Sequence, residues 1–308
     1  MEKKVLRSDL LMLLTSAIWG FAFVAQRQGM EHVGPFTYNG IRFALGSLSL
    51  VPLILILGKK RRRSAQNPEA RAKRRQDRTG LIVSGLIAGT ILFAGASLQQ
   101  IGIVYTGAGK AGFITGLYVV LVPLSGVFLG HKTGKATWLA AFLAVCGLYF
   151  LGVQDGFSNI NPGDALVALS AFFWAAHVLV IDRFCKRYDA ISLSAIQFAA
   201  TSIFSLLVAL LLESFILADI LSAALPILYG GLGSVGVAYT LQVIAQKDAP
   251  PAHAAILLSL EGVFAVIGGV LILSEPLTLR ILSGCVLMLL AMLATQWEVL
   301  FAKKKTYI

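Results

Sequence analysis

Long apolar segments separated by short polar ones dominate the pattern of this 308-residue chain. A helix that crosses a bilayer needs about 20 mainly apolar residues. Segments of this kind predict ten membrane-spanning helices, over residues 9–27, 36–57, 80–102, 108–130, 135–153, 163–181, 190–213, 223–243, 252–273 and 278–298. The pattern therefore predicts an all-α polytopic membrane protein.

The composition agrees with this fold class. Hydrophobic residues make up 57% of the chain, charged residues make up 13%, and the mean hydropathy is +0.80. These values exclude a soluble globular domain and a disordered chain. The three cysteines lack paired spacing, so neither a disulfide nor a metal site is expected. No cofactor is expected, because the glycines of residues 230–236 lack the lysine of a phosphate-binding loop.

Basic residues are distributed unevenly between the two sides of the predicted bundle. With the N-terminus in the cytoplasm, 22 of the 26 Lys and Arg residues lie on the cytoplasmic side, and the outer segments 28–35, 154–162 and 214–222 hold none. An excess of Lys and Arg marks cytoplasmic loops. The distribution predicts that both termini are cytoplasmic (N-in/C-in), and we expect the protein in a bacterial cytoplasmic (inner) membrane.

The longest polar segment, residues 59–79, is predicted to be a basic cytoplasmic loop. One interpretation is a binding site for anionic lipid or nucleic acid. The other is a solvated topology signal that lies against anionic lipid headgroups, which is the common role of such segments. We favour the second interpretation, and we expect contact with membrane lipid and no nucleic-acid partner, although the net charge of the chain is +11.

Similar residues recur along the chain at a fixed offset. Trp19 and Trp174 are 155 residues apart, and the same offset relates segment 41–44 (Ile-Arg-Phe-Ala) to segment 196–199 (Ile-Gln-Phe-Ala). Apolar helices that are similar by chance need not keep one register, so two matches at one offset indicate an internal duplication.

Beyond the basic segment the offset shortens to 143 residues, as expected if that segment is an insertion in the first half. The shorter offset relates Gln99 to Gln242. It also places Tyr118 where the second half has Glu261, so the predicted site is chemically asymmetric.

The duplication divides the chain into residues 1–153 and residues 154–308, each with five predicted helices. Because five is odd, the second half enters the membrane from the opposite side. Two inverted five-helix repeats are typical of alternating-access transporters, whose substrate site lies near the midplane between the halves.

One carboxylate, Glu261, lies near the middle of the predicted helix 252–273. A charge at that depth costs about 2.5–3.5 kcal/mol on insertion scales, and such residues usually face a cavity or a partner. Small residues, Ala265 and Gly268, share its helix face and leave room for a cavity. Glu261 is predicted either to exchange protons or to bind a substrate amine, and a nearby Arg42 would favour the second role by keeping it ionised.

Helical spacing places Tyr38 and Arg42 on one face of the predicted helix 36–57, together with Gly46 and Ser49. Arg42 either lines the transport pathway or extends outward as an interfacial anchor. We favour the pathway and include Tyr38 with it.

Trp174 and His177 also share one face of their predicted helix. His177 is either a proton-sensitive or substrate-binding group, or a neutral bridge between helices. The matched tryptophans, Trp19 and Trp174, fit an aromatic-lined cavity, although a packed core is the more common place for tryptophan. The matched glutamines, Gln99 and Gln242, either contact a polar ligand or bridge helices, and bridging is favoured.

Three segments resemble the EamA-type branch of the drug/metabolite transporter (DMT) superfamily. They are Trp19-Gly20, residues 108–123 (Ala-Gly-Lys-Ala-Gly-Phe-Ile-Thr-Gly-Leu-Tyr-Val-Val-Leu-Val-Pro), and Leu260-Glu261 followed by residues 274–278 (Ser-Glu-Pro-Leu-Thr). Their order and spacing extend the resemblance over essentially the whole chain. It implies a ten-helix secondary carrier, often an exporter of amino acids or other metabolites.

The chain departs from that family at two places. Gly262 follows the glutamate where family members commonly have Pro, and residues 131–132 are His-Lys where a glutamate commonly ends the fourth helix. The resemblance therefore implies neither the usual kink after Glu261 nor a symmetric pair of loop carboxylates.

The leading functional hypothesis is a secondary active transporter that exports a small polar or amphipathic metabolite, with protons as a candidate coupling ion. Its predicted site consists of Glu261, Arg42, Trp19, Tyr38, Tyr118, Trp174, His177, Gln99 and Gln242. An intramembrane lipid-modifying enzyme is the alternative, although the Gly-x-Ser-Gly and Gly-x-Gly-Asp motifs of intramembrane proteases are absent. A membrane receptor is disfavoured, because the chain has no large soluble domain.

Overall fold

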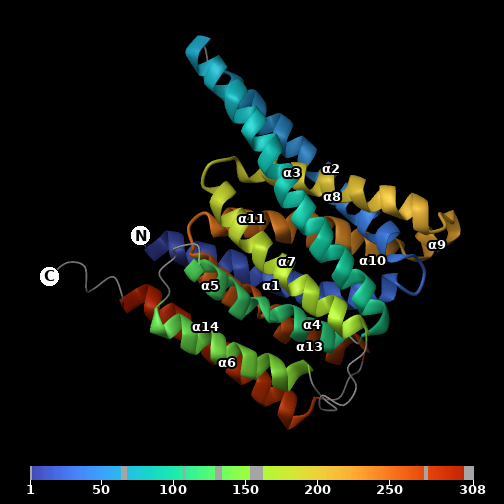
Figure 1. Cartoon of the computed structure of the whole chain (residues 1–308), viewed down its shortest axis with the longest axis vertical. Coiled ribbons are helices and arrows are strands. Elements are labelled where there is room, and N and C mark those ends of the chain that lie inside the picture. Colours follow the sequence, from blue (N-terminus) through green and yellow to red (C-terminus); the bar gives the residue numbers. More distant parts are fainter. Residues whose placement is uncertain are drawn as a thin grey trace.

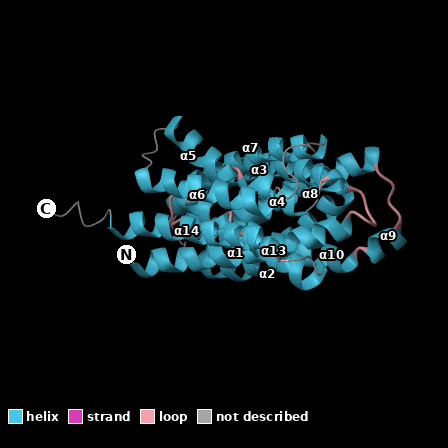
Figure 2. Ribbon diagram, turned by 90° about the horizontal axis from the view of Figure 1, so that it is seen from below, coloured by secondary structure: helices cyan, strands magenta, loops and turns pink. Residues whose placement is uncertain are grey.

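The computed structural model describes residues 2–63, 68–106, 108–128, 134–152, 162–273 and 277–301. All regular structure within these ranges is helical, and the helices pack side by side in one bundle (Figure 1). Viewed from a perpendicular direction, the start of α1 and the end of α14 lie at the same end of this bundle, and α9 lies at the opposite end (Figure 2).

Most of the predicted spans correspond to helices of membrane-crossing length. Within the described ranges, eight helical stretches are long and apolar enough to cross a bilayer, and two shorter apolar helices cover residues 135–150 and 279–294. The protein is therefore an all-helical, multi-pass membrane protein. The count of ten crossings, the N-in/C-in orientation and the inverted repeats stay predictions.

The helices are, in chain order, α1 (Glu2–Gly29), α2 (Pro35–Arg63), α3 (Pro68–Tyr105), α4 (Ala108–Gly116), α5 (Tyr118–Phe128), α6 (Lys135–Gly152), α7 (Pro162–Cys185), α8 (Ala190–Leu212), α9 (Leu217–Ser222), α10 (Ala224–Leu228), the π-helix η1 (Tyr229–Tyr239), α11 (Thr240–Gln246), α12 (Pro251–Leu258), α13 (Glu261–Leu273) and α14 (Leu279–Phe301).

The end of α2 and the start of α3 extend beyond the other helices (Figure 1). The prediction of a loop over residues 59–79 is therefore wrong for the backbone of residues 59–63 and 68–79, whereas residues 64–67 lie outside the described part. Lys, Arg, Ala, Gln and Glu dominate this segment and favour helix. Pro68 begins α3, where the missing N–H of proline costs no hydrogen bond. The side chains of this basic segment lie largely outside the described part of the chain.

Two predicted helices are broken in the structure. The fourth is divided at Leu117 into α4 and α5, and the ninth is divided at Ser259 and Leu260 into α12 and α13. Short-range backbone hydrogen bonds cross the second break, from Gly262 N–H to Ser259 O and from Val263 N–H to Leu260 O. Glu261 therefore begins a helix and does not lie in the middle of a continuous one.

The predicted eighth helix contains the π-helix η1, whose glycines allow α2 to approach closely. A Cβ at Gly231 would lie 3.1 Å from the backbone oxygen of Arg42, and one at Gly236 would lie 2.7 Å from the Ser49 hydroxyl. Such π-helical segments often mark functional sites. These glycines therefore permit close packing of η1 against α2.

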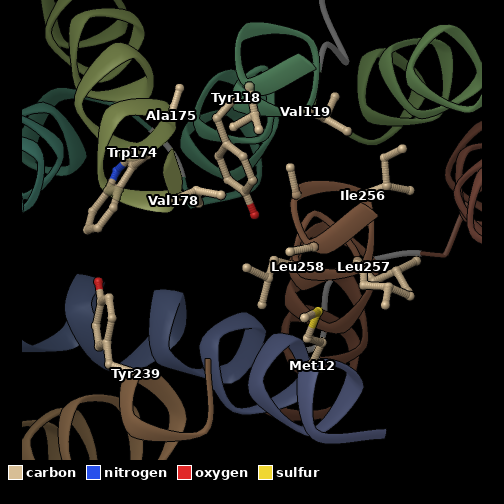
Figure 3. Packing of buried hydrophobic residues seen from close by; sticks show 14 of the residues in the cluster. Met12, Tyr118, Val119, Trp174, Ala175, Val178, Tyr239, Ile256, Leu257 and Leu258 are labelled. Atoms are coloured by element: carbon tan, nitrogen blue, oxygen red, sulfur yellow. The ribbon is translucent and has the colours of Figure 1, made fainter. Parts of the chain in front are cut away.

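Helices from the first and second parts of the chain pack together throughout the bundle. The most extensive contacts join α2 to α8, α6 to α14, α3 to α7 and α8, and α1 to α13 and η1. A large hydrophobic cluster fills the centre, where Tyr118, Trp174, Tyr239 and Leu257 come from four different helices (Figure 3).

The polar side chains are inside this bundle and apolar side chains cover much of the outside. Arg42 and Glu261 are 2% and 5% exposed, whereas Phe128 and Leu211 are 85% and 82% exposed. Water would oppose this arrangement, but lipid permits it, because apolar side chains lose nothing by facing acyl chains. Ionisable residues in such helices face the bundle interior.

Candidate functional site

A small central cavity lies between the first and second parts of the chain. Its volume is about 40 Å³, and it is lined by Trp19, Ala22, Phe23, Gln26, Arg42, Gln99, Thr115, Tyr118, Trp174, His177, Val178, Ser234, Tyr239, Gln242, Leu258 and Glu261. This volume holds a few water molecules. The cavity is too small for most metabolites as it stands, so a metabolite can bind only if side chains or helices around it move apart.

Tyr239, the last residue of η1, is the centre of an aromatic cluster that lines the cavity. Its ring centroid lies 4.5 Å from that of Trp19, 6.2 Å from that of Trp174, 6.1 Å from that of Phe43 and 6.0 Å from that of Phe198. Figure 3 shows the side chains of Trp174 and Tyr239 pointing toward each other from their helices. The rings give the cavity an apolar wall with polar edges.

Glu261 and Tyr118 begin the second segments of the two broken helices. The N-terminus of a helix carries a partial positive charge, which stabilises a carboxylate at the first turn of α13. The Tyr118 side chain lies close enough to Glu261 for electrostatic interaction. The Tyr118 hydroxyl lies beside the Glu261 carboxylate, although the two groups do not meet strict hydrogen-bond geometry. Among the described residues, no Lys, Arg or His forms an ion pair with Glu261.

Arg42 is buried beside the cavity and does not extend to the membrane surface. Its Nε donates a hydrogen bond to Asn39 Oδ1 at 3.0 Å, and its guanidinium carbon lies 5.0 Å from the Phe43 ring centroid and 5.3 Å from that of Tyr38. Tyr239 lies within electrostatic reach of both Arg42 and Glu261. The structure thus contains no direct Arg42–Glu261 pair, and aromatic rings surround the cation.

His177 bridges two helices, as one of its two predicted interpretations requires. Its Nε2 lies 2.9 Å from Gln197 Oε1, which joins α7 to α8. Both side chains are buried, at 1% and 0% exposure. The imidazole also lines the cavity and packs edge-on against Trp174 and Tyr239, so bridging does not remove it from contact with a ligand.

The two matched glutamines differ in their contacts. Gln99 Nε2 donates a hydrogen bond to Thr115 Oγ1 at 2.9 Å, which joins α3 to α4. Gln242 Oε1 is buried and has no hydrogen-bond partner in the described part of the chain. Bridging therefore describes Gln99, whereas the Gln242 oxygen remains available to a ligand.

Four buried polar atoms of cavity-lining residues lack a hydrogen-bond partner within the described ranges. They are Gln26 Oε1, Tyr118 Oη, Trp174 Nε1 and Gln242 Oε1. An unsatisfied buried polar atom costs about 1–3 kcal/mol. The set comprises two acceptors and two groups that can donate, which is what a ligand with both donors and acceptors would satisfy.

The cavity brings together eight of the nine predicted site residues: Glu261, Arg42, Trp19, Tyr118, Trp174, His177, Gln99 and Gln242. Tyr38 is the exception. Its hydroxyl donates a hydrogen bond to Pro226 O at 3.1 Å, and its ring packs against Arg42 from behind. Tyr38 thus supports the cation and does not face the cavity.

Sequence reasoning missed several lining residues, chiefly Tyr239, Gln26, Thr115 and Ser234. Tyr239 lies three residues before Gln242, a spacing that places both on one helix face and could have indicated it. The other three are single polar residues in apolar helices, for which the sequence carries no comparable signal.

Within the described ranges, no group of three or more His, Cys, Asp and Glu side chains is arranged to hold a metal ion.

Comparison with protein families gives one match that covers most of the chain. The model described as the EamA-like transporter family matches twice, over residues 6–153 and residues 161–296.

Individual relatives cover nearly the full length. An uncharacterized transporter of Archaeoglobus fulgidus is 30% identical over 297 residues, which is 96% of this chain and 88% of that protein. The uncharacterized transporter YoaV of Bacillus subtilis is 24% identical over 280 residues, 88% of this chain and 90% of that protein. A crystal structure matches with a TM-score of 0.73, at 19% identity and over 94% of this chain and 96% of that one. The last match supports the fold alone.

Proposed function

The chain belongs to the EamA-like transporter family, and we propose that it is a secondary active carrier of a small polar or amphipathic metabolite, such as an amino acid. Membership confirms the resemblance to the drug/metabolite transporter superfamily, and it makes the protein a multi-pass membrane transporter. We propose that both termini are cytoplasmic, because Lys and Arg are concentrated in the segments assigned to that side. We also propose export across a bacterial cytoplasmic membrane, which the family resemblance implies. The basic segment 59–79 would then lie against anionic lipid headgroups.

The proposed architecture is two inverted five-helix repeats, residues 1–153 and 154–308. The two family matches, which meet between residues 153 and 161, support this division. The breaks before Tyr118 and Glu261 support it further, because the same offset of 143 residues relates these two residues. Discontinuous helices at the interface of repeats commonly form the substrate site of secondary carriers.

The observation that carries the proposed function is one small, aromatic-walled cavity that gathers unpartnered polar atoms together with the buried charged residues Arg42 and Glu261. Ten further buried side-chain atoms in the described part of the chain also lack a partner, but they are scattered, whereas these four line one cavity. A polar metabolite can satisfy the Gln26, Trp174 and Gln242 atoms, whereas the Tyr118 hydroxyl already lies beside Glu261. The apolar part of the metabolite would contact the aromatic rings of the wall. A substrate with both characters therefore fits the lining.

Glu261 is the proposed coupling residue. An ionised carboxylate buried without a cation is unfavourable, so a proton or a positively charged group of the substrate must compensate it. The two compete for one carboxylate. Binding of one then requires release of the other, which couples substrate movement to a proton gradient if the transporter alternates between its two faces.

An untargeted comparison of metabolites can identify the substrate. Metabolites are measured inside and outside cells that overexpress the protein and cells that carry an empty vector. We expect one polar or amphipathic compound to accumulate outside the overexpressing cells. Equal metabolite profiles in the two cultures, with the protein present in the membrane, would contradict export.

Replacing Glu261 by Gln tests the role of the carboxylate. In vesicles containing the purified protein, we expect uptake driven by a pH gradient to fall at least about tenfold, because a hydrogen bond to a charged group contributes about 1.5–3 kcal/mol. Exchange of substrate without a gradient should persist in part. The matched control is Glu31→Gln, which removes an exposed carboxylate. Unchanged pH-driven uptake in Glu261→Gln would rule out this coupling role.

A further inference from the structure

A second hollow, separate from the central cavity, opens at the end of the molecule where α1 begins. It has a volume of about 690 Å³ and lies between the first turns of α1, the α7–α8 turn and the end of α11. We refer to it as the basic groove. Its wall comes from both parts of the chain, because α1 belongs to the first and the other elements belong to the second (Figure 1).

Positive charge predominates in the basic groove. Five cations line it, Lys4, Arg7, Lys186, Arg187 and Lys247, against two carboxylates, Asp189 and Asp248. These side chains come from three segments that are far apart in the sequence. The groove therefore forms only in the folded chain and is not a single charged loop.

Most of these cations are available to a ligand. Lys186 pairs with Asp182 at 2.7 Å, and Asp189 is engaged in accepting hydrogen bonds from the Ser192 backbone N–H and hydroxyl. Within the described ranges no ion pair involves Arg7, Arg187 or Lys247. The guanidinium of Arg187 lies 5.4 Å from the Tyr188 ring centroid, which limits its freedom. The groove thus contains positive charges that no carboxylate pairs with in the described part of the chain. At least one of them, Arg187, is held in place by a neighbouring ring.

Apolar side chains lie beside the cations. Leu11, Ile191 and Ile244 line the groove and are half-buried. A free inorganic anion would gain no favourable contact from these apolar side chains. A ligand that carries a phosphate together with an apolar portion satisfies both parts.

Polar contacts at the groove and beside it join the two parts of the chain. The Ser8 hydroxyl donates a hydrogen bond to Ala245 O. One residue further along α1, Asp9 Oδ1 lies 2.8 Å from His253 Nε2 of α12, and both side chains are buried. A ligand in the groove therefore lies next to contacts that must change if α1 and the second part of the chain move relative to each other.

We propose that the basic groove binds the phosphate of an anionic lipid headgroup, with Arg7, Arg187 and Lys247 contacting the phosphate and the half-buried apolar residues contacting the glycerol and acyl portion. Basic pockets between membrane-spanning helices commonly bind such headgroups. The proposed orientation places the groove in the cytoplasmic leaflet. The basic groove is a different site from the substrate cavity, and lipid binding there does not depend on the transported compound.

The test is an equilibrium titration of the purified full chain in non-ionic detergent, followed by native mass spectrometry. The probes are dioctanoyl phosphatidylglycerol, dioctanoyl phosphatidylcholine and inorganic phosphate. We expect saturable binding of phosphatidylglycerol that phosphatidylcholine does not reproduce. The double variant Arg7→Gln/Lys247→Gln should bind phosphatidylglycerol about thirtyfold more weakly, from the usual contribution of two basic residues at an anionic surface.

Two further variants distinguish binding in the groove from nonspecific attraction of the lipid to the positive charge of the protein. Arg78→Gln/Lys135→Gln removes the same charge from exposed positions outside the groove and should bind phosphatidylglycerol like the unmodified chain. Arg7→Lys/Lys247→Arg keeps the charge in the groove and should retain binding. Equal losses in the two glutamine variants, or equal binding of the two lipids, would overturn the proposal. Binding of inorganic phosphate as tightly as phosphatidylglycerol would also overturn it, because the ligand would then not be a lipid.

Discussion

The two sides of the central cavity match in their aromatic residues and differ in their polar ones. The offset of 155 residues relates Trp19 to Trp174 and Phe43 to Phe198. All four rings surround Tyr239, with centroid distances of 4.5, 6.2, 6.1 and 6.0 Å. The aromatic frame is therefore nearly the same on both sides.

The polar positions of the same frame carry different chemistry. In the proposed repeats, Arg42 corresponds to Gln197 and Tyr118 corresponds to Glu261. The matched tryptophans also differ. Trp19 Nε1 donates a hydrogen bond to Ser234 O at 3.3 Å, whereas Trp174 Nε1 has no hydrogen-bond partner in the described part of the chain. The first side holds the cation and the second side holds the carboxylate.

This difference indicates which features serve the fold and which serve the substrate. Large rings fill the interface and tolerate a symmetric arrangement. A pair of cations or a pair of carboxylates at matching buried positions would repel each other and remain uncompensated. An asymmetric pair of charges also gives the cavity two chemically distinct ends, which suits a substrate that itself has distinct ends.

The largest expected effect follows from making the second side resemble the first by Gln197→Arg. Gln197 is fully buried and bonded to His177, and no acidic side chain among the described residues pairs with either. An uncompensated buried charge costs about 3–5 kcal/mol, so we expect the free energy of unfolding to fall by that amount. Unfolding by dodecyl sulfate in mixed micelles measures it.

The control for this change is Gln197→Met, which removes the same hydrogen bond without adding charge. It should cost less, about 1–3 kcal/mol for the unpaired His177 nitrogen. If Gln197→Arg is as stable as the unmodified chain, burial does not enforce the asymmetry of the two sides.

The converse change, Arg42→Gln, makes the first side resemble the second. Loss of a charge-assisted contact of about 1.5–3 kcal/mol should weaken substrate binding by about 10- to 150-fold. Binding of the metabolite identified by the export comparison, measured in detergent, tests this. Arg183→Gln, which removes an exposed arginine, should leave binding unchanged. Equal binding in the two variants would assign Arg42 to the fold alone.

The substitution Gly20→Ala tests why the first side has glycine at a position where the second side has alanine. Gly20 corresponds to Ala175. A Cβ at Gly20 would collide with Phe264 and lie 2.7 Å from the backbone oxygen of Glu261. We expect Gly20→Ala to lower the free energy of unfolding by about 1–3 kcal/mol, because α1 and α13 must separate.

Gly112→Ala is the matched control for the Gly20 change. A Cβ there would meet only the Phe23 ring, at 4.0 Å. It should therefore be neutral or stabilise the protein by up to about 1 kcal/mol. Similar losses in both variants would show that close approach of α1 to α13 is not the reason for Gly20.

The sequence predicts the helices well and the breaks within them poorly. Runs of apolar residues mark membrane helices because lipid requires them, and Glu261 and Arg42 are conspicuous because they interrupt such runs. The break at Ser259 and Leu260 has no local signal, since neither Gly nor Pro occurs there. Tyr239 reaches the cavity at the end of a π-helix, which the apolar pattern does not distinguish from an α-helix. A tyrosine in an apolar segment reads equally well as a residue at the lipid interface.

The smallest expected effect separates the matched glutamines. Gln99→Ala breaks the bond to Thr115 between α3 and α4 and should cost about 0.6 kcal/mol of unfolding free energy, the average for such bonds in membrane proteins. Gln242→Ala removes an oxygen that has no protein partner in the described part of the chain, so stability should change less. Substrate binding should instead weaken about two- to tenfold, from a neutral hydrogen bond of about 0.5–1.5 kcal/mol. If both variants lose stability equally and neither loses affinity, the unpartnered Gln242 oxygen is not a substrate contact, and the difference between the two sides is confined to their charged residues.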